Sequence, residues 1–396
     1  MERSWVLTDA ASGLWVETLE LGPEQLGIPG CAVRKRRLRG GLRDGVDLVE
    51  VTCGELSFSV VPTRGMGVWR GSYGGQALGW RSPVRGPVHP AFVDPAERGG
   101  VGWLRGFDEW IVRCGLDSNG MPGPDMRVDA AGLAESVELT LHGMIANLPA
   151  HTVQVTADAA AGVISVTGQV DEAGLFLPSL RLSTSISAGP DSSRITIADT
   201  VRNLQDMPAE LQLLYHCNFG PPFLEEGSRV LLPFSEAAPR DARSAEGVAE
   251  IDRYHGPAPG FVQQAYWIRP AARPGDTATL AALVNPSRTA AAVMRFDVGE
   301  LPCFSLWKNT AGERDGYVTG LEPGTNFPNL KSVERDAGRV VELPAGGDYA
   351  ATLMLEVASG EEAVAAIESE VQEIQAGAAA TVHAEPHAAF GAVGDE

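Results

Sequence analysis

Three short segments of the sequence carry side chains suited to proton transfer. His142 lies in a Leu-His-Gly segment, His216 in a Tyr-His-Cys-Asn-Phe segment, and Glu322 in a Gly-Leu-Glu-Pro segment. Imidazole and carboxyl groups exchange protons near neutral pH and are common general acids and bases in enzymes. The three segments therefore predict acid–base chemistry, provided that the fold brings them together.

The segment around His216 has the alternation of a strand. Successive side chains on a strand point to opposite faces, so His216 faces away from Tyr215 and from Cys217. Cys217 is therefore expected to be a core thiol rather than a nucleophile. The face that carries His216 also carries Leu214 and is typical of a ligand-facing row, although a solvated outer face is the alternative. Its three polar side chains are Gln212, His216 and Asn218.

The other two segments permit a structural and a functional interpretation. Gly143 has no Cβ, so a ligand or another backbone can approach His142 closely, but a histidine before glycine is also common in turns. Pro323 keeps Glu322 extended and ends a strand there, at a place where loops gather around binding sites. A surface carboxylate before a turn is the alternative for Glu322.

A fourth cluster mixes aromatic and charged side chains in residues 102–110 (GWLRGFDEW). Arg105 and Asp108 stand there among aromatic rings, a mixture that suits sugars, because rings cover C–H patches while charged groups bind hydroxyls. A buried structural ion pair is the alternative. The cluster favours a carbohydrate ligand.

The scaffold that must position these residues is predicted to be all-β. Clear alternation of apolar and polar residues recurs in many short segments, and no linker divides the chain between residues 14 and 357. One large domain of two packed sheets, residues 1–376 with its core in about 14–357, is therefore expected. The segments are residues 56–60, 163–166, 180–186, 194–198, 211–216 and 353–357.

The C-terminal part follows a different pattern. Val364, Ile367, Val371 and Ile374 recur at helical spacing, which predicts a short amphipathic helix over about residues 360–376. The Ala-rich residues 377–396 show no periodicity and are expected to form a flexible tail.

Charge and composition exclude several classes of partner. The 396 residues include 31 Lys and Arg against 51 Asp and Glu, a formal charge of −20. Such a surface repels phosphate backbones and anionic lipids, so neither nucleic acid nor membrane is expected as a partner. No apolar stretch has the length of a membrane span and no apolar signal core follows the first residues, so we expect a cytoplasmic protein.

The five cysteines predict free thiols. They are odd in number, widely spaced and without a Cys-x-x-Cys pair, so reduced and mostly buried side chains are expected. They are Cys31, Cys53, Cys114, Cys217 and Cys303.

The His-Gly, His-Cys-Asn and Glu-Pro segments, in this order, resemble the aldose 1-epimerase (galactose mutarotase-like) family. Its members carry an early His-Gly, a later strand histidine followed by Asn, and a Glu-Pro near the C-terminus. The resemblance covers roughly residues 40–357. Residues 62–67 (PTRGMG) and 102–108 (GWLRGFD) are similar to a divergent bacterial branch of that family.

The resemblance implies a β-supersandwich enzyme that interconverts the anomers of an aldose. By motif position Glu322 matches the family's general base, His216 its general acid, and His142 its substrate-orienting histidine. No cofactor and no metal is implied. His216 and Glu322 would have to face each other across a gap of the size of a sugar.

Substrate-binding residues follow with less guidance from the motifs. Asp252 falls where relatives keep a hydroxyl-binding aspartate, and Asp108 and Asn218 are expected to bind hydroxyls. Cationic side chains near the motifs would suit a phosphorylated, sulfonated or oxidised sugar, and the sugar itself is left open. These cationic residues are Arg64, Arg105 and Lys308.

Other functions use the same residues differently. His142, His216 and Glu322 could converge on a divalent metal for a lyase or isomerase acting on an acidic sugar. Asp108 and Glu322 could serve as the carboxyl pair of a glycosidase. A sugar-binding protein without turnover would depend on its aromatic residues instead. The partner expected in each case is a small-molecule sugar, and assembly as a homodimer is left open.

Overall fold

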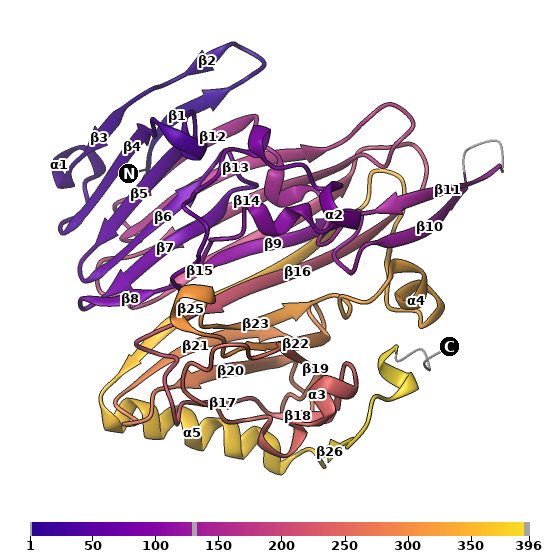
Figure 1. The fold of residues 1–396 in the computed structure, drawn as a ribbon. Coiled ribbons are helices and arrows are strands. Elements are labelled where there is room, and N and C mark those ends of the chain that lie inside the picture. The colour runs from indigo at the N-terminus through magenta and orange to yellow at the C-terminus, as the bar shows by residue number, and fades with distance from the viewer. Residues whose placement is uncertain (1, 129–132, 392–396) are drawn as a thin grey trace.

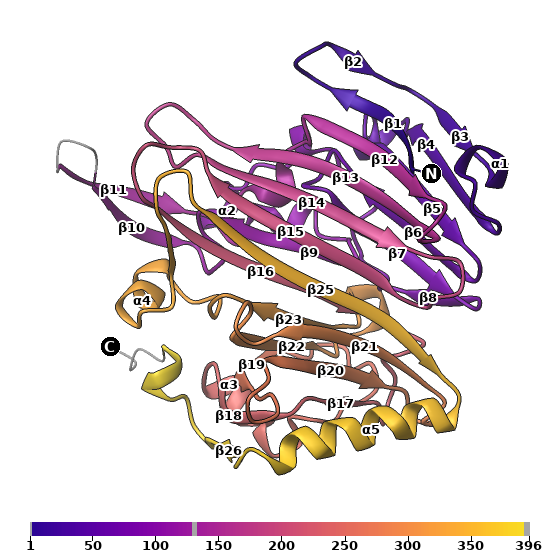
Figure 2. The same ribbon diagram turned by 180° about the vertical axis from the view of Figure 1, so that it is seen from behind.

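Two large, mainly antiparallel sheets pack face to face in the computed structural model, which describes residues 2–128 and 133–391 (Figures 1 and 2). The expected two-sheet β-sandwich is confirmed, and so are all six strand segments predicted from alternation. Because apolar side chains two apart share one face, each sheet presents a continuous apolar surface to the other.

The first sheet has ten strands. In spatial order they are β17 (Arg229–Leu231), β20 (Ala278–Val284), β21 (Ala290–Asp297), β25 (Asp348–Ser359), β15 (Ile195–Asn203), β14 (Leu180–Ala188), β13 (Val163–Glu172), β12 (Thr152–Asp158), β1 (Glu2–Asp9) and β2 (Leu14–Trp15).

The second sheet has fourteen strands and carries the His216 and Glu322 segments, whereas the His142 segment lies in a turn beside it. In order they are β26 (Thr381–Val382), β18 (Phe234–Pro239), β19 (Gln264–Pro270), β22 (Cys303–Asn309), β23 (Val318–Gly324), β16 (Ala209–Phe219), β9 (Ile111–Leu116), β7 (Gly67–Tyr73), β6 (Leu56–Val61), β5 (Asp47–Cys53), β4 (Cys31–Arg37) and β3 (Leu19–Leu21), with β8 (Gln76–Leu78) beside β7 and β24 (Val341–Leu343) beside β16.

A separate two-stranded hairpin projects from one end of the sandwich (Figure 1). It consists of β10 (Gly123–Val128) and β11 (Ala134–Leu139).

Helices are short apart from one. No helix among residues 2–128 and 133–391 is long and apolar enough to cross a lipid bilayer. The α-helices are α1 (Pro23–Leu26), α2 (Glu97–Gly100), α3 (Ala242–Ala245), α4 (Lys331–Asp336) and α5 (Glu361–Ala376).

Helix α5 confirms the predicted C-terminal helix. It lies along the outer side of the first sheet beside β20 (Figure 2). All four residues of its predicted apolar face are buried against Leu280 and Val293. The helix therefore covers apolar side chains that the sandwich leaves on its outside.

The expectation of a flexible tail over residues 377–396 is wrong for the part that the structure describes. Strand β26 pairs in parallel with β18, and Phe390 is only 1% exposed. Phe390 packs with Trp267 and Phe327 on the outer side of the second sheet. Its burial escapes a search for periodicity because one aromatic side chain anchors the segment.

The expectation that all cysteines are reduced is wrong for one pair. Cys31 on β4 and Cys53 on β5 are direct cross-strand partners and form a disulfide. Cys114, Cys217 and Cys303 are buried free thiols, as expected. The two paired residues are 22 positions apart, so only the strand register brings them together.

An ion pair links the two sheets inside the core. Arg113 on β9 donates to both carboxylate oxygens of Asp199 on β15. It also donates to Oγ1 of Thr184 on β14, at 2.7 Å. The hydroxyl of Tyr215 donates to Asp199 at 2.8 Å. Arg113 and Asp199 are almost fully buried, so each charge depends on the other.

Replacing Arg113 by Met should destabilise the fold by about 3–5 kcal/mol, because Asp199 would remain buried without its cation. Urea denaturation measures the change. Arg202→Met is the matched control, since Arg202 forms an exposed pair with Asp348 and its loss should change little. Equal stability of the two variants would contradict the importance of the buried pair.

Candidate active site

Strands β16 and β23 bring His216 and Glu322 into direct contact. These strands are hydrogen-bonded neighbours, with Cys217 opposite Leu321. Nε2 of His216 lies 3.1 Å from Oε1 of Glu322, and the residues are 5% and 3% exposed. The expected sugar-sized gap between them is therefore wrong. Their contact is not an aligned hydrogen bond, and Oε1 of Glu322 has no hydrogen-bond partner among the described residues.

The two faces of β16 are occupied as the alternation predicts. Leu211, Leu213, Tyr215 and Cys217 lie in the core between the sheets. His216 faces outward together with Leu214, which packs on Trp103 and Phe107. Burial raises the pKa of the Cys217 thiol well above its ordinary value, in agreement with an inert core thiol.

Gly320 makes room for the carboxyl group of Glu322. A Cβ at Gly320 would lie 2.2 Å from Oε1 of Glu322 and 3.0 Å from Cε1 of His216. Both distances are too short for non-bonded atoms. The glycine is therefore required by the close approach of the two functional side chains.

Asn218 fixes the orientation of His216. Its Oδ1 lies 2.7 Å from Nδ1 of His216, while its Nδ2 donates to the carbonyls of Glu109 and His216. Because an amide oxygen only accepts, Nδ1 carries the imidazole proton, and the neutral ring presents a bare Nε2 to Glu322. Asn218 is fully buried in these contacts, so its position does not support the direct contact with a sugar expected from the sequence.

His142 joins the pair from a strained turn. Its ring centroid lies 5.6 Å from that of His216, and its backbone φ is 59°. Nδ1 lies 2.8 Å from the carbonyl of Asn119, so that nitrogen donates and Nε2 is bare. A Cβ on Gly143 would lie 2.1 Å from the carbonyl oxygen of Ser118, which explains the glycine after His142.

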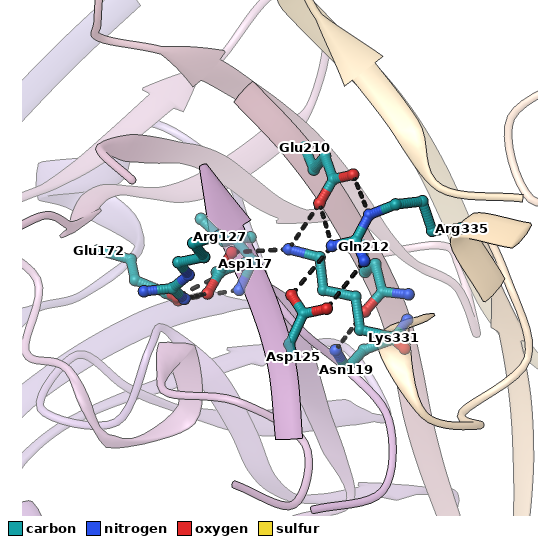
Figure 3. Close-up of polar contacts among 10 residues, drawn as sticks. Asp117, Asn119, Asp125, Arg127, Glu172, Glu210, Gln212, Lys331 and Arg335 are labelled. Atoms are coloured by element: carbon teal, nitrogen blue, oxygen red, sulfur yellow. Dashed lines mark hydrogen bonds and ion pairs between the residues drawn. The ribbon is translucent and has the colours of Figure 1, made fainter. Parts of the chain in front are cut away.

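A network of charges fixes the loop that holds His142 (Figure 3). Glu172 accepts hydrogen bonds from the backbone of Leu116 and Asp117, and the Asp117 carboxylate accepts from Lys331 at 2.8 Å. Gln212 accepts from the backbone of Asn119 at 3.2 Å. The carbonyl that orients His142 is thereby held from several elements. The charges around Lys331 are completed by Arg127, Asp125, Glu210 and Arg335.

Aromatic rings surround His216. Ring centroids of Trp103, Phe107 and Trp307 lie 6.1, 5.0 and 5.4 Å from the imidazole centroid. Trp103 and Phe107 belong to the aromatic cluster predicted from the sequence. Trp307 lies outside that cluster in the sequence, and the pairing of β22 with β23 brings it beside His216.

Burial sets the protonation of these groups. It raises the pKa of Glu322 well above its ordinary value. Burial and the neighbouring His142 lower the pKa of His216 well below its ordinary value. Burial also lowers the pKa of His142 to about 4. Both shifts favour the uncharged form of the His216–Glu322 pair, with the transferable proton on Glu322.

The structure does not bring the charged members of the aromatic cluster to His216. Arg105 is exposed and forms a bidentate pair with Glu97 at 2.7 and 3.1 Å. Oδ2 of Asp108 accepts a hydrogen bond from the indole of Trp69 at 2.7 Å. The buried ion pair offered as the structural alternative is not formed either, because Arg105 is exposed and Asp108 is bonded to an indole.

Two other predicted ligands, Arg64 and Asp252, also have structural partners. Arg64 is fully buried and donates to Glu109 and Asn147. Asp252 is paired with Arg229 at 2.6 Å on the surface. The positions of Arg64 and Asp252 therefore do not support their predicted contact with a sugar.

Lys308 lies on the opposite face of β22 from Trp307. Its Nζ donates to the carbonyls of Glu250 and Arg253 at 2.9 and 2.7 Å. Burial lowers the pKa of Lys308 to about 7. The amine closes a loop against the sandwich and does not reach the His216–Glu322 pair.

The pKa shift of Glu322 predicts a pH-dependent stability. A carboxyl group with a raised folded-state pKa stabilises the fold fully below its unfolded value of 4.5 and loses that contribution as the pH rises. Glu322→Gln keeps the shape but cannot ionise. As the pH rises above 4.5, the free energy of unfolding of the variant should therefore increase relative to that of the parent, by up to about 1.4 kcal/mol for each pH unit.

Urea unfolding between about pH 5 and about pH 8 measures this difference. The exposed Glu342, replaced by Gln, is the control and should give a profile parallel to that of the parent. A parallel profile for Glu322→Gln as well would contradict a buried, proton-binding carboxyl group.

Comparison with known proteins places the chain in a family. Residues 43–357 match the family described as "Domain of unknown function (DUF4432)". A candidate aldose 1-epimerase from Klebsiella pneumoniae subsp. pneumoniae MGH 78578 has a solved structure with a TM-score of 0.91 and 33% identity, over 98% of this chain and 99% of that one. A comparison with curated proteins gave no match.

More distant structures share the fold. A galactose mutarotase-like protein from Clostridium acetobutylicum has a TM-score of 0.55 at 15% identity, over 80% of this chain and 96% of that one. Galactose 1-epimerase from Lactobacillus acidophilus NCFM has a TM-score of 0.50 at 10% identity, over 83% and 99%. The chain therefore has the galactose mutarotase-like fold and belongs to the DUF4432 family.

Proposed function

We propose that this protein is an aldose 1-epimerase that interconverts the anomers of a sugar at His216 and Glu322. The observation that carries the proposal is the buried contact of Nε2 of His216 with Oε1 of Glu322, at 3.1 Å. Opening a hemiacetal ring removes a proton from the C1 hydroxyl and adds one to the ring oxygen. A pair that holds one proton and can accept another meets both needs.

The proton balance of the pair fits this reaction. Transfer of the Glu322 proton to His216 gives a carboxylate base and an imidazolium acid, a charge separation that the hydroxyls of a bound sugar would favour. The carboxylate takes the C1 hydroxyl proton and the imidazolium protonates the ring oxygen as the bond between C1 and that oxygen breaks. The aldehyde rotates about C1–C2, and reversal of both transfers closes the other anomer.

His142 would bind a hydroxyl of the sugar. Its Nδ1 is committed to the carbonyl of Asn119, so the bare Nε2 can accept a hydrogen bond from a substrate hydroxyl. With its pKa lowered to about 4, His142 stays neutral at physiological pH. The histidine would therefore orient the sugar without exchanging protons with it.

A sugar can reach the pair only if surrounding side chains move. Trp103 and Phe107 are buried, whereas Trp307 is partly exposed and its indole donates to Gln263 in an exposed loop. A cavity of about 610 Å³ lies beside Trp80. The ring centroids of Trp80 and Phe107 are 5.0 Å apart. These contacts make Trp307 and Trp80 the rings expected to shift on binding.

The metal-dependent alternative has less geometric basis. The ligand atoms of His142, His216 and Glu322 do not all come within 4.8 Å of one another. Among the described residues, Glu236, His383 and His387 do meet this spacing. A sugar-binding protein without turnover remains the second candidate, because the ring-lined site would serve either function. Activity of the variants below separates the two.

Glu322→Gln and His216→Asn should each lower the mutarotation rate by about 100- to 10,000-fold, because each removes one proton-transfer partner. Polarimetry or NMR exchange across neutral and acidic aldoses measures the rate. His255→Gln is the control, since His255 is an exposed histidine that also pairs with a carboxylate, Glu250. Parental rates in either site variant would refute the assignment.

Absence of turnover for every aldose, with sugar binding retained in Glu322→Gln, would favour the binding protein instead. Isothermal titration calorimetry with the same sugars supplies the binding measurement.

Gly320→Ala should lower the rate in a similar way while the fold persists. The added methyl group would occupy the position of Oε1 of Glu322 and force the carboxyl group away from His216. Gly22→Ala is the control for a glycine substitution, because φ of Gly22 is −94° and an added Cβ would meet only the flexible side chain of Gln25, at 3.3 Å. Full activity of Gly320→Ala would show that the observed contact is not needed.

A further inference from the structure

A second group of titratable side chains lies at the C-terminal segment, away from the His216–Glu322 pair. Glu236 on β18 and two histidines of the segment, His383 and His387, offer ligand atoms that all lie within 4.8 Å of one another. Nε2 of His383 is 2.7 Å from Oε1 of Glu236. Two imidazoles and one carboxylate form a common ligand set for zinc and related divalent metals.

We propose that Glu236, His383 and His387 bind a divalent transition metal ion of the zinc class, and that the ion fastens the C-terminal segment onto β18. The inference is independent of the proposed sugar chemistry.

The backbone already places the three residues side by side. Strand β26 pairs in parallel with β18, with Glu236 opposite Thr381, and the amide of His383 donates to the carbonyl of Ala237 at 2.8 Å. The carboxylate and the first imidazole thus come from paired strands. His387 follows four residues later, in a His-x-x-x-His spacing, and its ring stacks on that of His383.

Each candidate ligand offers one atom to the ion. Oε1 of Glu236 and Nε2 of His383 hydrogen-bond each other, so the ion would replace the proton between them. Nδ1 of His387 accepts a hydrogen bond from the amide of Ala389 at 3.3 Å, which leaves Nε2 at the surface. Arg269 pairs with Oε2 of Glu236 at 2.9 Å, which leaves Oε1 to the histidines. Nε2 of His383 already points to Oε1 of Glu236.

Binding requires one local adjustment. The two imidazole rings are stacked, with centroids 4.0 Å apart and planes 18° apart, so their nitrogen lone pairs do not yet converge on one point. His387 is exposed, whereas His383 is partly buried. We therefore expect the His387 ring to turn toward Glu236 when the ion binds.

The position of the site gives the ion a structural role. Beyond His387, Phe390 is buried beside Phe327, and Arg269 and Arg339 donate to the carbonyl of Ala389. Asn329 also donates to the carbonyl of Phe390, at 2.8 Å. An ion bound to both β18 and the segment would add a cross-link at the other end of this short stretch.

The test uses full-length protein without a histidine tag. Calorimetry and metal analysis after dialysis against Zn²⁺ should show about one ion per chain, and Zn²⁺ should raise the unfolding temperature. His387→Asn keeps the acceptor for the Ala389 amide, and His383→Gln keeps the donor to Glu236. Either variant should weaken Zn²⁺ binding by at least about tenfold and abolish the thermal shift.

His255→Gln is again the matched control, because His255 and Glu250 form a histidine–carboxylate pair without a second histidine. It should bind Zn²⁺ like the parent. Equal Zn²⁺ affinity of the parent, His383→Gln and His387→Asn would overturn the proposal, as would failure of the parent to bind the ion. Co²⁺ absorption that appears in the parent and is lost in both variants would confirm imidazole ligation.

Discussion

The central constraint in this structure is that both faces of β16 are buried. Tyr215 and the residues two positions away on either side, Leu213 and Cys217, face the other sheet. The Tyr215 hydroxyl donates there to the Asp199 carboxylate, which is paired with Arg113. His216 faces outward under a layer of aromatic rings. A shift of the strand by one residue would exchange the two sets of side chains, so the core fixes the register of the site.

The same burial that fixes the register sets the chemistry of the outward face. Burial favours the protonated form of the Glu322 carboxyl group and the neutral form of the His216 imidazole. The charged form of the pair is therefore disfavoured in the sugar-free protein. A polar ligand that enters would change that balance at the moment when proton transfer is needed.

Local periodicity was a reliable guide to part of this molecule. The alternation in residues 211–216 predicts both faces of β16, and the helical spacing from Val364 to Ile374 predicts α5. The segments around His142, His216 and Glu322 could be selected for the same reason, because side-chain chemistry and strand parity are local properties. The direct contact between His216 and Glu322 is not local, since it depends on Gly320 leaving space.

The residues whose positions could not be predicted from the sequence are held by contacts with residues that are distant in the chain. Lys331 and Asp117 meet across 214 positions, and no pattern near either one indicates the loop that they hold for His142. Arg105 and Asp108 lie in the right segment, but Glu97 and Trp69 take their charged groups. The C-terminal segment was missed because Phe390 anchors it through a contact with Phe327, outside any period.

Strand β26 has one more consequence, for assembly. An unpaired strand at the rim of a sheet invites another chain to continue the ladder, which is a frequent route to dimers and to fibres. Here the protein's own C-terminal segment occupies that position on β18, at Glu236 and Ala237. Where the segment is docked, a second copy cannot pair with β18 at these two residues.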